Sequence, residues 1–188
     1  MTQALALLLV LFVFGCTSFV LAPAGKVPIA NTYTINSKTP WSRLIQGKTE
    51  LWTIDGLPLH ELRFITNLSD GDKLLTGKAG KNIMPFQNTM TPIEVMEMVE
   101  GVFAASNIRN ITTRNLRPYQ FGSAEGFRFD FSFLSEDGLE KEGFAVGTIV
   151  GAKKEKRLHL IFYRGTRLYY YGKHKGAAEN IVNSITLL

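Results

Sequence analysis

Three histidines and one cysteine are the side chains of this sequence best suited to metal or nucleophilic chemistry. His60, His159 and His174 lie far apart, and none has a second histidine or a cysteine at the four-residue spacing of a helical zinc site. No glycine-rich phosphate-binding loop is present either. We therefore predict no catalytic residue, no cofactor and no metal site, and hence a protein that is not an enzyme.

One enzymatic alternative stays open. Asp55, His60 and a serine could converge in the fold and form a hydrolase site, which spacing along the sequence does not reveal. The geometric criterion is a histidine in a pocket beside both a carboxylate and a hydroxyl.

Two shorter motifs resemble functional loops but predict turns. Residues 70–72 lack the further acidic ligands of a calcium loop, and in residues 122–126 the first glycine is one place too close to the serine of a nucleophile elbow.

The cysteine, Cys16, directly follows Gly15 and an unbroken apolar run of eleven residues, Ala4–Phe14. A bilayer-spanning helix needs about 20 apolar residues, whereas eleven suits the apolar core of a secretory signal peptide. A small residue behind such a core predicts cleavage next to it, between Gly15 and Cys16. The alternative is an ordinary secretory signal that is cut further on, near Ala22 or Ala24.

The stretch Val13-Phe14-Gly15-Cys16 resembles the lipobox of bacterial lipoproteins, although Phe14 is bulkier than the residue usual there and no Lys or Arg precedes the apolar run. The resemblance implies that Cys16 is the lipid attachment site and the first residue of the mature chain. It implies a membrane-anchored protein of the cell envelope that faces the periplasm. Thr17, where an aspartate would favour retention in the inner membrane, favours the outer membrane. An acylated Cys16 leaves no thiol for catalysis.

Positive charge is concentrated near the end of the sequence. The formal net charge of the 188 residues is +5, while residues 151–188 alone hold eight basic and two acidic side chains. A predicted hairpin turn carries four of these cations: Lys153, Lys154, Lys156 and Arg157. We expect this tip to contact an anionic lipid, a cell-wall polymer or an acidic protein, and not nucleic acid, because the chain is exported. A merely solvated turn is the alternative. Four later cations are expected at the same end of the sheet: Arg164, Arg167, Lys173 and Lys175.

Two helices are predicted. Thr91 and Glu94 have the spacing of a capping box, with Pro92 at the first helical position. Apolar residues then recur at helical spacing to about Ser106. They predict a buried stripe of Val95, Met96, Val99, Val102 and Phe103. A second helix is predicted from Lys173 onward, and residues 168–171 either extend the sheet or lead into this helix.

Alternating and apolar runs predict the strands. They cover residues 33–35, 50–54, 59–68, 111–121, 127–133, 144–150 and 158–163. Asp55-Gly56 indicates a hairpin between the second and third of them, and the last three form an antiparallel meander. In the strand from Phe127 to Phe133 we expect Phe129 and Phe131 in the core and Arg128 and Asp130 in solvent. Residues 69–90 are predicted to form one long loop.

These elements predict an α+β domain in which helices flank an antiparallel sheet. Residues 51–57, 86–94 and 181–185 resemble uncharacterised proteobacterial lipoproteins, and the order of elements is similar to the PsbP-like fold, an α/β/α sandwich. That resemblance covers most of residues 33–188, and its better understood members are mainly binding or assembly proteins. We therefore predict a signal peptide (1–15), a lipidated tether (16–32) and a single domain (33–188) that acts without catalysis.

Overall fold

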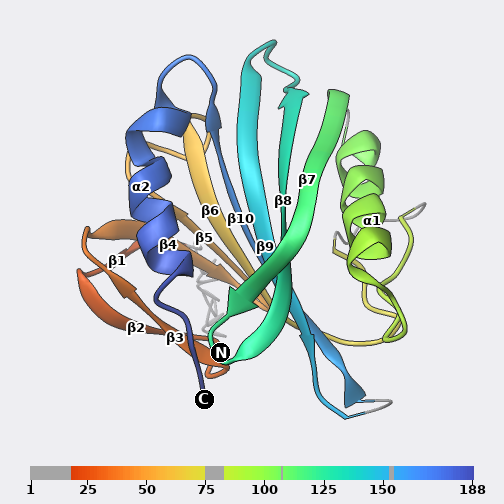
Figure 1. Cartoon of the computed structure of the whole chain (residues 1–188). Coiled ribbons are helices and arrows are strands. Elements are labelled where there is room, and N and C mark those ends of the chain that lie inside the picture. Colours follow the sequence, from red (N-terminus) through yellow and green to blue (C-terminus); the bar gives the residue numbers. More distant parts are fainter. Residues whose placement is uncertain (1–17, 75–82, 107, 153–154) are drawn as a thin grey trace, which may run out of the picture.

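A computed structural model describes residues 18–74, 83–106, 108–152 and 155–188. They form an eight-stranded antiparallel sheet, a smaller three-stranded antiparallel sheet and two helices (Figure 1). The strand order is β1-β4-β5-β6-β10-β9-β8-β7 in the large sheet and β11-β3-β2 in the small one. The predicted fold class, an antiparallel sheet flanked by helices, is confirmed.

The elements have the following bounds. The strands are β1 (Val20–Ala22), β2 (Gly25–Ile29), β3 (Tyr33–Ser37), β4 (Trp41–Gln46), β5 (Thr49–Thr53), β6 (His60–Leu68), β7 (Arg109–Phe121), β8 (Ala124–Leu134), β9 (Glu140–Val150), β10 (Arg157–Thr166) and β11 (Thr186–Leu187). The helices are α1 (Pro92–Ala105) and α2 (Tyr170–Val182). The sequence therefore missed β1, β2, β4 and β11, each six residues or shorter.

The predicted hairpin and meander are both present. β5 pairs with β6, and β8, β9 and β10 pair in sequence, all antiparallel. β10 also pairs with β6, which joins the two groups at the centre of the sheet. Two glycines of β9 make room for aromatic rings of β8: a Cβ on Gly143 would lie 2.3 Å from the Phe131 ring, and one on Gly147 would lie 2.7 Å from the Phe127 ring. A close approach of the neighbouring strand thus explains both glycines.

The capping box that begins α1 is confirmed. Thr91 donates its backbone N–H to Glu94 Oε2 over 2.7 Å, and the Glu94 N–H is directed at Thr91 Oγ1 at 3.4 Å. The residues of this helix that become buried are Val95, Met98 and Val99. Met98 was not in the predicted stripe, and Met96, Val102 and Phe103 are only half-buried.

The two helices lie on opposite sides of the large sheet (Figure 1). α1 and the adjoining part of the 69–90 loop cover one face, where Phe86 is fully buried against the phenylalanines of β8. The two described ends of this loop are tied together, since Gly71 donates to the Phe86 carbonyl and Phe86 to the Asp72 carbonyl, each over 2.8 Å. α2 and the small sheet cover the other face, around Trp41, Trp52 and Tyr163.

The prediction for the polar side of β8 is wrong for Arg128. Phe129 and Phe131 are fully buried as expected, but Arg128 is only 7% exposed. Its guanidinium forms a bidentate pair with Glu179 of α2, at 2.7 and 2.6 Å, and lies 4.0 Å from the centre of the Phe144 ring. Asp130 is half-buried beside Arg117 and Arg128. The alternation was read correctly, but α2 covers the face that the sequence assigned to solvent.

The expectation of a tether over residues 16–32 is wrong for residues 20–29. β1 pairs with β4 and β2 pairs with β3, and the side chains of Ala22 and Ile29 are buried. These strands are too short and too interrupted by Pro23, Gly25 and Pro28 to give a recognisable pattern. The domain therefore begins at Val20. In the part of the chain that the structure describes, no helix is long and apolar enough to cross a bilayer.

Candidate functional site

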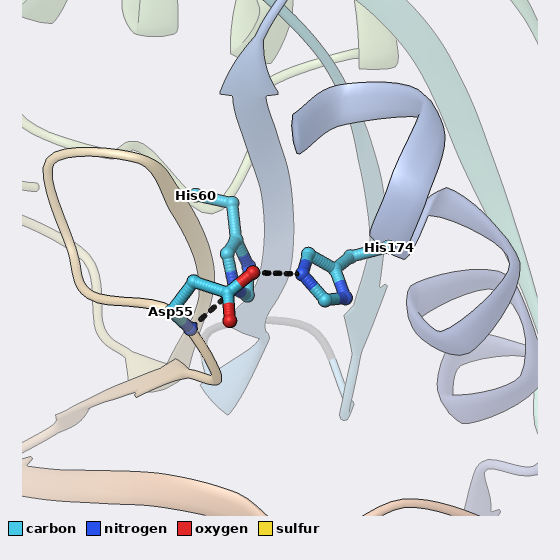
Figure 2. A group of neighbouring side chains, drawn as sticks. All are labelled: Asp55, His60 and His174. Atoms are coloured by element: carbon cyan, nitrogen blue, oxygen red, sulfur yellow. Dashed lines mark hydrogen bonds and ion pairs between the residues drawn. The ribbon is translucent and has the colours of Figure 1, made fainter. Parts of the chain in front are cut away.

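A group of one carboxylate and two imidazoles lies where α2 meets the loop between β5 and β6 (Figure 2). Asp55 belongs to that loop, His60 is the first residue of β6, and His174 lies in α2. Asp55 Oδ2 lies 2.7 Å from His174 Nε2, and the two imidazole rings stack with their centres 4.1 Å apart. Both histidines are buried, whereas the carboxylate is partly exposed.

His60 is held in one tautomer by the backbone of its own hairpin. Its Nε2 accepts the N–H groups of Ile54 and Asp55, at 3.0 and 3.1 Å. A nitrogen that accepts carries no proton, so the proton of the neutral ring lies on Nδ1. That Nδ1 is buried without a hydrogen-bond partner. Burial, followed by the nearby His174, lowers the pKa of His60 to about 4, so the ring is neutral near pH 7.

Asp55 is the anion of the group. Lys173 Nζ and His174 Nε2 each lie 2.7 Å from the same oxygen, Oδ2. The hydrogen bonds from Lys173 and then from His174 lower the pKa of Asp55 to about 2. Because this carboxylate is ionised, the nitrogen of His174 that faces it carries a proton. The arrangement ties α2 to the β5–β6 hairpin.

Asp55, His60 and His174 together offer the donor atoms of a possible metal site. One oxygen and two nitrogens that lie within 4.8 Å of one another match three protein ligands of a zinc ion in number and type. The lone pair of His60 Nε2 is however already directed at two backbone N–H groups. Ligation through Nδ1 would put a proton on Nε2, facing those same donors. The Lys173 ammonium on Asp55 would also repel a cation. These residues do not fit a metal ion.

The hydrolase alternative requires a histidine that lies beside both a carboxylate and a hydroxyl. Asp55 and His60 do converge, as that alternative required, but His174 is the residue that bonds the carboxylate. In the described segments, no serine, threonine or tyrosine hydroxyl is hydrogen bonded to either imidazole of the group. Ser135 lines a cavity with His60, yet its Oγ lies 2.7 Å from the Leu139 carbonyl and serves its own turn. The geometry therefore supports a structural role for this group.

The sequence missed His174 as a member of the group, because 119 positions separate it from Asp55. A usable signal was the pair Lys173–His174 in the predicted final helix, since a lysine and an adjacent imidazole near a helix start both favour an acidic partner or solvent. Which acidic side chain that would be depends on where α2 docks, and no local pattern contains this information.

The predicted basic tip is described only in part. Cys16, Lys153 and Lys154 lie outside the described residues. Lys156 and Arg157 are half-buried at the start of β10. Neither forms an ion pair with a carboxylate in the described part of the chain. Their role toward an anionic partner stays a prediction.

The expectation that the later cations join this tip is wrong. Arg164 lies seven residues further along β10 than Arg157, or about 24 Å away at the rise of a strand. Three of the four are also paired with acids from elsewhere in the chain: Arg164 with Glu61, Arg167 with Glu140 and Glu142, and Lys173 with Asp55. Lys175 lies over the Tyr171 ring. Folding therefore cancels much of the charge excess that residues 151–188 show in the sequence.

Comparison with known proteins gives a likeness of structure only. No protein-family model matches the chain, and no curated protein sequence does. Among solved structures, the chain is similar to the cyanobacterial PsbP (CyanoP) of Synechocystis, with 14% identity, a TM-score of 0.49, and coverage of 93% of this chain and 95% of that one. It is also similar to LpqN of Mycobacterium tuberculosis, described as involved in cell envelope biogenesis, with 10% identity, a TM-score of 0.43, and coverage of 92% and 85%.

Proposed function

We propose that this chain is a bacterial envelope lipoprotein, anchored by lipid on Cys16, whose domain binds or assembles partners without catalysis. The observation that carries the proposal is the junction Gly15–Cys16 behind eleven apolar residues. An acyl chain contributes about 0.8 kcal/mol per buried methylene, so two or three chains hold a protein firmly where one does not. The cysteine is the only one in the sequence, which makes it the single position where such an anchor can be attached.

The start of the fold supports this anchor. Phe19 lies three residues after Cys16, so their Cα atoms are at most about 11 Å apart even when the chain is fully extended. The domain would thus be held against the bilayer and not on a long tether.

The residues next to the anchor suit contact with lipid. Phe19, Val20 and Leu21 are 46%, 51% and 72% exposed, and β1 is an edge strand of the large sheet. Three consecutive exposed apolar residues at the start of an edge strand are a liability in water. In the interfacial region of a membrane, the same side chains are stabilised by burial among the lipids.

The non-catalytic part of the proposal is supported by the histidine group. The lone pair of His60 Nε2 accepts two backbone N–H groups, and the protonated nitrogen of His174 serves Asp55. The lone pair of His60 is therefore engaged by its own hairpin, and the proton of His174 joins α2 to that hairpin.

The anchor is tested by the intact mass of the protein extracted from bacterial membranes. We expect a chain that begins at Cys16 and carries the added mass of a diacylglyceryl group and a further acyl chain. Cys16→Ser should abolish the lipid and release the protein from the membrane fraction. A lipid-free wild-type mass, or a mature chain that starts near Ala22 or Ala24, would refute the proposal. A mature chain that starts near Ala22 or Ala24 would also lack most or all of β1.

A further inference from the structure

Lys141 is a buried lysine in the large sheet. This residue lies near the start of β9 and is only 6% exposed. Its Nζ donates one hydrogen bond, to the carbonyl oxygen of Pro58 in the β5–β6 loop. Among the described residues no carboxylate forms an ion pair with it. An ammonium has three N–H donors, so two remain for another acceptor.

The side chain lines the wall of an open cavity of about 470 Å³. The cavity is lined by the β5–β6 loop, by the turn between β8 and β9 and by the end of β10. Leu57, Pro58 and Leu59 supply an apolar wall next to the ammonium. A volume of this size holds a small organic molecule.

Charges of both signs line the cavity, Glu136 and Asp137 together with Lys141 and Arg164. Arg164, which also lines it, shares the buried carboxylate of Glu61 with Arg63, at 2.7 and 2.5 Å. Two guanidinium groups around one carboxylate leave a net positive charge. Burial first, and Arg164 in addition, lower the pKa of Lys141, while Asp137 acts in the opposite direction. The Asp137 carboxylate itself faces its own turn, where it lies 2.5 Å from Ser135 Oγ.

We propose that this cavity binds the oxyanion group, carboxylate or phosphate, of a small organic molecule. Lys141 would donate its two remaining N–H groups to the anion, and the Arg63–Glu61–Arg164 group would favour it at longer range. The apolar part of the ligand would lie on Leu57 and Leu59. An uncompensated buried charge is costly, and a bound anion offsets that cost. The site is independent of the lipid anchor and gives the binding domain a ligand class.

The test is a titration of the full chain, purified in non-ionic detergent, with three probes followed by NMR and calorimetry. Butyrate and inorganic phosphate distinguish a carboxylate from a phosphate ligand, and butyramide is the neutral isostere of butyrate. We expect saturable shifts of the Leu57, Ser135 and Lys141 amides with one or both anions, and binding about tenfold or more weaker with butyramide. Absence of saturable shifts with both anions, or equal binding of butyramide, overturns the proposal.

Variants of Lys141 test whether its charge binds the anion. Lys141→Met should weaken anion binding about tenfold or more, whereas Lys141→Arg should retain most of it. Lys175→Met, which removes an exposed lysine on α2, should leave binding unchanged. Unchanged affinity in a folded Lys141→Met protein overturns the site. If that variant does not fold, the wild type decides: saturation with the bound anion must raise the pKa of the Lys141 ammonium, and a constant pKa refutes the contact.

Discussion

The two faces of the large sheet are built from alternate residues of the same strands, yet they are held together by different forces. β8 turns Phe127, Phe129, Phe131 and Phe133 toward α1, where they pack with the buried residues of that helix. The same strand turns Arg128 toward α2, where it meets Glu179. The α2 face also holds the three histidines, His60, His159 and His174, buried among aromatic rings.

The two faces of the sheet therefore contribute to the stability of the fold in two different ways. Directly under α1, burial of aromatic surface stabilises the fold, and that contribution does not depend on protonation. Under α2, part of the stability requires neutral imidazoles and ionised carboxylates in fixed positions, so it depends on pH. The comparison therefore predicts that mutations on the α1 face shift stability at every pH, whereas mild acid acts on the α2 face.

The largest effect is expected on the α1 face. Phe129→Ala removes a fully buried ring between β8 and α1 and should cost about 3–5 kcal/mol of unfolding free energy. Asp130→Ala, one residue further on, removes a half-exposed carboxylate from loose ion pairs of 3.4 and 3.9 Å and should cost less than about 1 kcal/mol. Urea denaturation of both variants measures the difference. Similar midpoints would mean that the two sides of β8 contribute alike.

Mild acid should destabilise the protein through the α2 face. Burial lowers the pKa of both His60 and His159 to about 4, whereas an unfolded histidine titrates near pH 6.5. Between these values the unfolded chain binds more protons, so stability is complete above about pH 6.5 and falls as the pH drops toward 4. Each ring accounts for about 2–3 kcal/mol over this window.

The carboxylate of the same group acts in a separate window. Since the pKa of Asp55 is lowered to about 2, its stabilising contribution is lost only as the pH falls from about 4 toward 2. Thermal unfolding between pH 4 and pH 8 checks the histidine contribution. Phe129→Ala should lower the whole curve without changing its slope, while His159→Gln should reduce the slope. A wild-type stability that is constant from pH 7 to pH 4.5 would contradict the assignment.

A smaller effect is expected from the buried ion pair. Arg128→Met leaves Glu179 without its partner, but that carboxylate keeps 26% of its surface in solvent. We therefore expect a cost of about 1–3 kcal/mol, below the 3–5 kcal/mol typical of a fully buried pair that loses one member. The double variant Arg128→Met/Glu179→Met should recover most of this cost, because no charge is then stranded. Additive losses in the double-mutant cycle would show that the two side chains do not act as a pair.

The sequence predicted the α1 face far better than the α2 face, and the reason is physical. The phenylalanines of β8 and the capping box at Thr91 are local patterns, with periods of two residues and spacings of three. The fate of Arg128 depends on Glu179, 51 positions away, and that of Asp55 on His174, 119 positions away. Both depend on where α2 docks. Short edge elements such as β1 and β11 likewise become strands only because a partner strand is already in place.

The smallest expected effect for each side chain concerns the cations of the predicted hairpin tip. Arg167, at the far end of β10, is paired with Glu140 and Glu142, whereas Lys156 and Arg157 form no ion pair with a described carboxylate. On vesicles with anionic lipid at low salt, changing Lys153, Lys154, Lys156 and Arg157 to Gln should weaken binding by about 1 kcal/mol for each cation that reaches the surface. The difference should shrink at physiological salt, where charges beyond about 8 Å are screened. Arg167→Gln is the matched control and should change binding little. Equal binding by the fourfold variant and the wild type would show that the hairpin tip does not contact the anionic surface. Contact with the membrane would then rest on the proposed anchor at Cys16 and the exposed edge strand.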